Sequence, residues 1–180
     1  MARISNPTAA RDIRLKKLAR SIEALKAKDD IVLAHARQMT ALRRSAAADL
    51  YAICEDFVDS VNGLLEHPEV QLDPPGYSEE SFRDDVPNLV QINVRGRILQ
   101  VAFRATPELV STEDFRVPYT LEGTVRAFNQ ELLDKDLIEE QLIFFTLEHH
   151  KRMWRFFDAR TYRSGPFDQE YLIGLMEQLL

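Results

Sequence analysis

Apolar residues recur at alternating spacings of three and four along the first third of the chain. The run from Thr8 to Asn62 contains neither Gly nor Pro, so no residue in it is a strong helix breaker. Sustained over about seven heptads, a 3-4 spacing is typical of a coiled coil. The pattern therefore predicts a long amphipathic helix with an oligomer seam made of Leu15, Leu18, Ile22, Leu25, Val32 and Met39.

Two charged residues, Asp29 and Arg43, occupy seam positions. In a parallel, in-register pair each would face its own copy, and such like charges disfavour that arrangement or specify register and oligomer number. The seam alone leaves parallel and antiparallel pairing open. An alternative interpretation breaks the helix at 28–30, where an Asp would cap a second helix and no coiled coil would form.

The apolar stripe widens after position 45, because Ala47, Cys54 and Val61 add a third column beside the seam. A narrow seam suits a partner helix, whereas a wider face suits packing against a sheet. A straight helix of this length would extend about 80 Å, more than a compact domain of this size is wide. We therefore expect residues 1–44 to form a stalk and residues 45–65 to be the first helix of a domain that spans 45–180.

Strand signals follow a polar, proline-containing loop at 66–88. Apolar residues alternate with polar ones over 90–94 and again over 99–103, on either side of Arg95-Gly96. A hairpin closed over this dipeptide pairs Ile92 with Leu99, Val90 with Val101 and Gln91 with Gln100, so register and pattern agree. A short strand is expected around 115–119.

The remaining elements are predicted from spacing and caps. Thr120 is expected to cap a helix that runs to about Lys135, with Leu121, Val125, Phe128 and Leu132 on one face. The aromatic content of 139–159 favours a second hairpin around Glu148-His149-His150, although helical spacing within it keeps a helix open as an alternative. Asp168 is expected to cap a final helix with a core-facing stripe of Leu172, Leu175, Met176 and Leu179.

The predicted fold class is α+β: a long N-terminal coiled-coil helix, then a small domain with an antiparallel meander sheet of about five strands and two further helices. The order within 45–180 is helix, three strands, helix, two strands, helix. This order resembles that of the class I type III secretion chaperones, which are small acidic dimers. The resemblance implies a domain that holds an unfolded stretch of an effector protein.

Charge divides the chain more sharply than its total of −6 suggests. Residues 1–44 carry eleven Lys or Arg and four Asp or Glu, a net +7, which leaves −13 for the other 136 residues. The arm is thus basic and the body acidic. No segment approaches the ~18 apolar residues of a membrane span, and a single cysteine, Cys54, implies no disulfide. We expect a cytoplasmic protein with no membrane partner.

Two groups of basic residues are candidate anion or nucleic-acid contacts. The first lies on the arm and the second around the lone tryptophan: Arg11, Arg14, Lys16, Lys17 and Arg20, then Lys151, Arg152 and Arg155. Clustered cations attract phosphates in a salt-dependent manner, and Arg beside aromatic side chains can stack on bases. A pocket lined by Trp154 and the nearby arginines is a further hypothesis, for an enzymatic or ligand-binding body.

The sequence contains no phosphate-binding loop, nucleophile elbow or His-Glu-x-x-His motif. His149 and His150 are expected in a solvated turn because adjacent strand positions point to opposite faces. No catalytic residue, metal, cofactor or small-molecule partner is therefore predicted. The leading hypothesis is a non-enzymatic assembly or adaptor protein that self-associates or docks on a helical partner through its first helix and binds a protein or peptide with its body. The alternatives are a nucleic-acid-associated protein and a secretion-chaperone-like effector binder.

Overall fold

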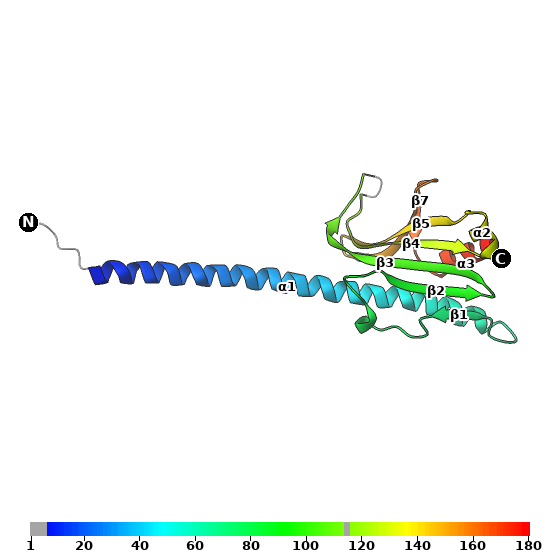
Figure 1. Cartoon of the computed structure of the whole chain (residues 1–180), viewed down its shortest axis with the longest axis horizontal. Helices are drawn as coiled ribbons and strands as arrows, with labels where there is room; N and C mark the ends of the chain where they lie inside the picture. Colours follow the sequence, from blue (N-terminus) through cyan, green and yellow to red (C-terminus); the bar gives the residue numbers. More distant parts are fainter. Residues whose placement is uncertain (1–6, 114–115) are drawn as a thin grey trace, which may run out of the picture. The chain divides into compact units, whose positions relative to one another are not determined.

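The computed structural model describes residues 7–113 and 116–180 (Figure 1). Helix α1 spans Pro7–Asn62 and stays helical through 28–30, so the alternative with a break at Lys28-Asp29-Asp30 is wrong. The chain divides into two compact units, the first ending at Ala41 and the second running from Leu42 to Leu180. The long N-terminal helix is therefore confirmed, while its pairing into a coiled coil stays a prediction.

The second unit contains an antiparallel sheet whose seven strands pair in chain order. The meander and the α+β class are as predicted, but two short edge strands raise the strand number above five. The strands are β1 Val70–Asp73, β2 Asn88–Val94, β3 Arg97–Val110, β4 Tyr119–Phe128, β5 Glu139–Glu148, β6 Lys151–Asp158 and β7 Arg163–Pro166.

The hairpin of β2 and β3 has the predicted register, with Ile92 opposite Leu99 and Val90 opposite Val101. Its turn residues Arg95 and Gly96 both have positive φ, 50° and 88°. Two successive positive φ values define the turn whose twist matches that of paired strands. The Asn93 side chain accepts a hydrogen bond from the Gly96 amide at 2.8 Å and closes this turn.

The predicted helix from Thr120 to Lys135 is wrong, because 119–128 form the central strand β4 and only Gln130–Asp134 form a short helix, α2. Gly123 would weaken a helix at this point, and in the strand it allows a close approach between backbones. A Cβ at this position would clash with the Ala102 carbonyl oxygen, so the backbones of β3 and β4 approach too closely for a side chain. Asn129 then caps α2 by accepting a hydrogen bond from Leu132 N.

The predicted loop at 66–88 contains β1 and a short 3-10 helix, η1 (Glu79–Ser81). The end of α1 positions β1, because the Asn62 side chain bonds both the N–H and the carbonyl of Val70, at 3.0 and 2.9 Å. The strand expected around 115–119 begins only at Tyr119, and its residue 115 lies outside the described residues.

The second predicted hairpin is confirmed as β5 and β6, so the helical alternative for 139–159 is wrong. His149 and His150 form its turn, and His149 has a φ of 52°. Helix α3, Gln169–Leu179, begins after Asp168, whose carboxylate accepts the Tyr171 amide hydrogen bond. Its buried residues are the four that the spacing predicts: Leu172, Leu175, Met176 and Leu179.

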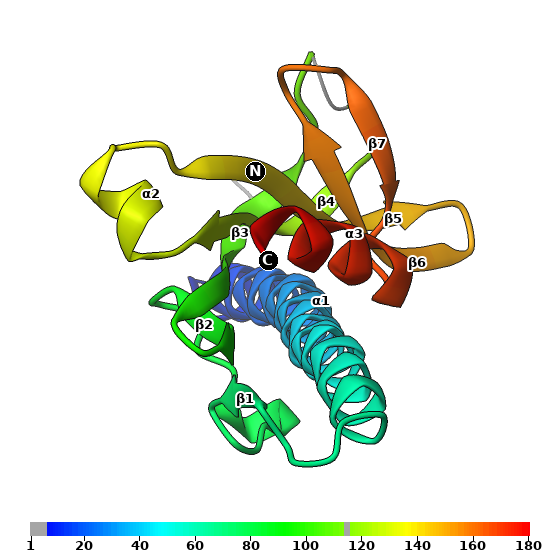
Figure 2. The ribbon, with the colours of Figure 1, turned by 90° about the vertical axis from the view of Figure 1, so that its right-hand side faces the viewer.

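The core of the second unit lies on one face of the sheet. Figure 2 shows α3 beside the last turns of α1, both within the curve of the sheet. Residues 46–58 of α1, the stripe of α3 and the inward side chains of β2 to β6 form one apolar cluster. Trp154 lies at its centre and contacts Phe103 edge-on and Phe145 at a tilt. The opposite face of the sheet carries a smaller aromatic cluster.

Candidate self-association surface

The predicted seam lies on one stripe of α1, and in the first unit this stripe faces solvent. All side chains from Ala10 to Gln38 are exposed. The large apolar ones at seam positions remain more than half exposed: Leu15 55 %, Leu18 56 %, Ile22 58 %, Leu25 59 % and Val32 62 %. Met39, the last predicted seam residue, is half-buried. These five side chains follow the 3-4 spacing and form an apolar stripe on one side of the helix, which Asp29 interrupts between Leu25 and Val32.

The same 3-4 spacing has a different role in the second unit. There Ala46, Leu50 and Phe57 are buried against the chain's own sheet. In the added column Ala47 and Cys54 are 0 % exposed, whereas Val61 is half-buried against the same core. One periodic pattern thus meets an intramolecular surface after position 45 and, before position 39, presents apolar side chains to solvent.

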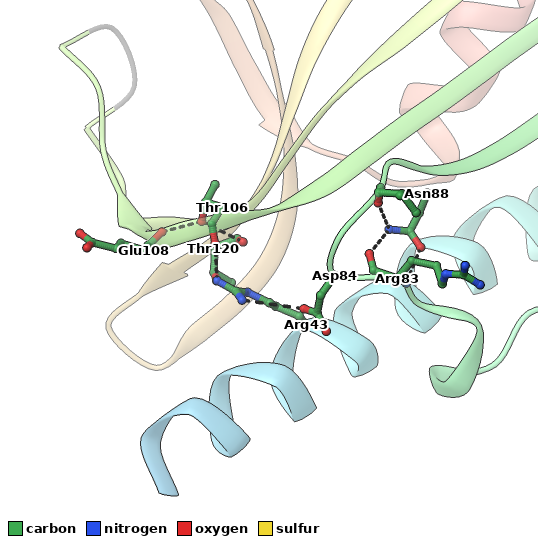
Figure 3. Close-up of polar contacts among 8 residues, drawn as sticks. Arg43, Arg83, Asp84, Asn88, Thr106, Glu108 and Thr120 are labelled. Carbon is green, nitrogen blue, oxygen red and sulfur yellow. Dashed lines mark hydrogen bonds and ion pairs between the residues drawn. The ribbon is translucent and has the colours of Figure 1, made fainter. Parts of the chain in front are cut away.

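Arg43 marks the place where the stripe enters the second unit (Figure 3). Its Nε donates to Thr120 Oγ1 at 2.9 Å, its Nη2 donates to the Thr106 carbonyl, and its Nη1 lies 3.9 Å from Asp84 Oδ1. The Arg43 side chain is only 14 % exposed. Because a buried guanidinium needs acceptors, this charged seam position is accounted for by contacts within the second unit.

Asn88 organises the chain next to this contact and is also drawn in Figure 3. Its amide exchanges two hydrogen bonds of 2.9 Å with the backbone of Arg83. Tyr77 donates a third, at 3.3 Å, to the same side-chain oxygen. These bonds fix the loop that carries Asp84 toward Arg43. The sequence signal for this role is weak, since one Asn before a strand is common in loops.

The basic residues predicted as anion or nucleic-acid contacts lie in two places, on the N-terminal part of α1 and on β6. Arg11, Arg14, Lys16, Lys17 and Arg20 are exposed on α1. In the body, Lys151 and Arg152 are exposed but adjacent on β6, so their side chains leave opposite faces of the sheet. Arg155 is half-buried and donates to Ser164 Oγ at 3.3 Å. The three body residues therefore do not converge on one anion site.

Trp154 does not line a pocket, which corrects the hypothesis of a ligand site around it. It is 3 % exposed, and its Nε1 donates to the Ala46 carbonyl at 2.7 Å. The Cys54 thiol is equally enclosed, and burial raises its pKa to about 12. Both side chains act as core residues, as expected for Cys54.

The outer face of the sheet carries a hollow of about 560 Å³ that the sequence did not reveal. Tyr119, Phe144 and Phe157 lie in its lining, and the rings of Tyr119 and Phe144 are 4.4 Å apart. An ion pair between Arg104 and Glu122, 3.0 Å long, lies at its edge. Strand β5 carries apolar side chains on both faces of the sheet, so its sequence lacks the apolar–polar alternation that would distinguish the outer face.

The residues that the structure describes hold neither a metal-binding cluster nor a membrane-spanning helix. They contain no group of three or more His, Cys, Asp or Glu side chains that could hold a metal ion. None of their helices is both long and apolar enough to cross a membrane. Comparisons with protein-family models, with curated proteins and with solved structures gave no significant match.

Proposed function

We propose that this chain is a non-enzymatic assembly protein whose N-terminal helix pairs with the same helix of a second copy. One observation carries the proposal: the seam side chains from Leu15 to Val32 are all more than half exposed in the single chain. Burying apolar area stabilises a complex by about 25 cal/mol per Å², before the cost of association. An exposed stripe of this regularity is a recognised signature of helix pairing.

Spacing matters more than exposure alone. Ile13 and Ile31 are also exposed, at 68 % and 71 %, but they lie off the seam. In heptad notation, with Leu15 at a and Leu18 at d, Ile13 falls at f and Ile31 at c. These positions face away from a partner helix. The chain thus provides matched controls of the same chemistry on the same helix.

The test replaces Leu18, Ile22 and Leu25 together by Gln in the full chain and measures the mass in solution over micromolar concentrations. Gln favours helix, so the helix persists while its stripe becomes polar. The native chain should be dimeric and the triple variant monomeric. The control Ile13→Gln/Ile31→Gln should remain dimeric. A native chain that is monomeric throughout this range would refute the proposal.

A second candidate function uses the basic residues of the same helix to bind nucleic acid. Lys16, Lys17 and Arg20 fall at heptad positions b, c and f, opposite the seam, so helix pairing leaves them accessible. Binding to a duplex oligonucleotide should weaken steeply with salt. Replacing Arg14, Lys16, Lys17 and Arg20 by Glu should abolish it, whereas Lys151→Glu/Arg152→Glu should leave it unchanged. Binding whose strength does not change with salt concentration would exclude this function.

The binding of a protein or peptide by the body stays a prediction. The resemblance to secretion chaperones rested on an element order that the structure does not have, since four strands precede α2 and three follow it. The effector-binding alternative therefore gains no support from that order. The hollow on the outer face of the sheet, with its aromatic lining, is the surface best shaped for a partner.

A further inference from the structure

We infer that two copies of α1 pair antiparallel in one register, centred on Arg20, with Asp29 of each copy opposite Arg11 of the other. This inference rests on the proposed function and adds the orientation and register that the apolar stripe by itself leaves open. It starts from Asp29, the acidic residue within the exposed part of the seam.

Asp29 occupies an a position, between Leu25 and Val32 on the stripe. Pairing of two helices would remove its carboxylate from water, which is unfavourable unless a cation faces it. In a parallel, in-register pair Asp29 would face Asp29 of the second copy. That arrangement places two negative charges in one layer of the seam and is disfavoured.

In an antiparallel pair each a position faces a d position of the other helix. The d positions along the described part of the stalk are Arg11, Leu18, Leu25, Val32 and Met39. Arg11 is the basic residue among these five. Charge complementarity therefore selects the register that sets Asp29 of one copy against Arg11 of the other. In this register the residue numbers of two facing seam residues add up to forty.

This register also aligns the apolar layers. Leu15 faces Leu25 of the second copy, and Leu18 faces its Ile22, so symmetry gives four consecutive apolar layers. The two Asp29–Arg11 layers close them at either end. Ala19 and Ser21 flank the centre, where small side chains allow the helices to approach closely.

Charges beside the seam neither favour nor oppose this register. In antiparallel pairs e positions face e positions, which sets Asp12 against Lys26 of the second copy. The g positions set Arg14 near Lys28 of the second copy, and that contact is repulsive. Symmetry doubles each contact, so two opposite-charge contacts beside the seam offset two like-charge ones on long exposed side chains, and the Asp29–Arg11 layers decide the register.

The first experiment reverses the charges in the full chain and measures the dimer dissociation constant by sedimentation. Asp29→Arg and Arg11→Asp should each weaken the dimer by about tenfold or more. The double variant should recover to within about threefold of the native chain, because the pair is restored with its ends exchanged. In a parallel pair like charges would face each other in the native chain and in every one of these variants, so the two single variants would not both weaken the dimer.

The control Asp30→Arg changes charge by the same amount at an outward b position and should leave the constant unchanged. General repulsion between basic helices predicts instead that Arg11→Asp strengthens the dimer, so that result would overturn the register. A double variant that stays as weak as the single variants would also overturn the register. The proposed function would still stand in that case if the native chain is dimeric and the Gln variant of the seam is monomeric.

Cross-linking gives an independent readout. Under mild oxidation, a mixture of Leu15→Cys and Leu25→Cys chains should form a disulfide between unlike chains, and Leu25→Cys by itself should form none. The native chain, whose thiol is the buried Cys54, is the background control. Efficient self-cross-linking of Leu25→Cys would indicate parallel pairing. A monomeric native chain would refute the proposed function and this register together.

Discussion

Trp154 Nε1 donates a hydrogen bond of 2.7 Å to the carbonyl oxygen of Ala46 and so joins β6 to α1 across 108 positions of sequence. The bond is buried, and the indole ring packs on Phe103 and Phe145. It holds the helix against the sheet at the residue where the apolar stripe of α1 becomes part of the core.

Replacing Trp154 by Phe should lower the free energy of unfolding of the body by about 1–3 kcal/mol, because the buried bond and part of the packing are lost. Urea unfolding followed by circular dichroism would measure this. Met153→Leu, at the neighbouring half-buried position, conserves volume and should cost less than about 1.5 kcal/mol. Equal stability of the native chain and Trp154→Phe would show that the bond contributes nothing.

Gly123→Ala should destabilise the sheet by about 3 kcal/mol or prevent folding, because the new Cβ would meet backbone atoms of β3, which cannot move aside. Gly174→Ala is the matched control. A Cβ at Gly174 meets nothing within 4 Å, so replacing this helical glycine in α3 should stabilise by about 0.5–1 kcal/mol. Thermal unfolding of both variants provides the comparison, and effects of the same sign would contradict it.

Arg95→Asn should stabilise the β2–β3 hairpin by about 0.5–1 kcal/mol. Arg95 has a φ of 50°, a conformation that costs most side chains energy but that Asn tolerates. Arg95→Lys retains the strain and should lie within about 0.5 kcal/mol of the native chain. Chemical unfolding at equal chain concentration distinguishes the two, and a destabilised Asn variant would contradict the interpretation of the turn.

The Cys54 thiol should resist modification until the body unfolds. Burial raises the pKa of this thiol to about 12 from an ordinary value near 9. The reactive thiolate is therefore scarce at pH 8 and becomes common only as the pH approaches 12. A colorimetric thiol reagent should label the native chain very slowly and the denatured chain at once. Ala27→Cys, at an outward position on the exposed part of α1, should add one thiol that reacts rapidly without denaturant.

Elements whose local and long-range signals agree were predictable from sequence. The β2–β3 hairpin has matching alternation on both strands and a turn dipeptide between them, and α3 has both a cap and a stripe. β4 was misread because Leu121, Val125 and Phe128 fit a helical spacing, whereas Leu121, Gly123 and Val125 also alternate as a strand does. Pairing of β4 with both β3 and β5 accompanies the strand conformation, and such tertiary contacts are invisible to local propensity.

The candidate surface shows a similar limit. A 3-4 spacing predicts that one face of α1 must be covered, but not by what. Between Ala46 and Phe57 the cover is the chain's own sheet, which sequence indicated only through the third apolar column. Arg43 appeared to be a flaw in the stripe, and only the positions of Thr106 and Thr120 give it acceptors. The outer-face hollow depends on the curvature of the sheet, which no local pattern encodes.

The exposure of residues 10–38 has a consequence for how firmly this part of α1 is held. A helix without tertiary contacts relies on propensity and opens readily, whereas amides beneath a packed core open only with global unfolding. In the monomeric Gln variant, amide protons before position 38 should therefore exchange with deuterium orders of magnitude faster than those of 46–58. In the native chain, slow exchange confined to residues 11–29 would map the paired segment directly, without any substitution in it.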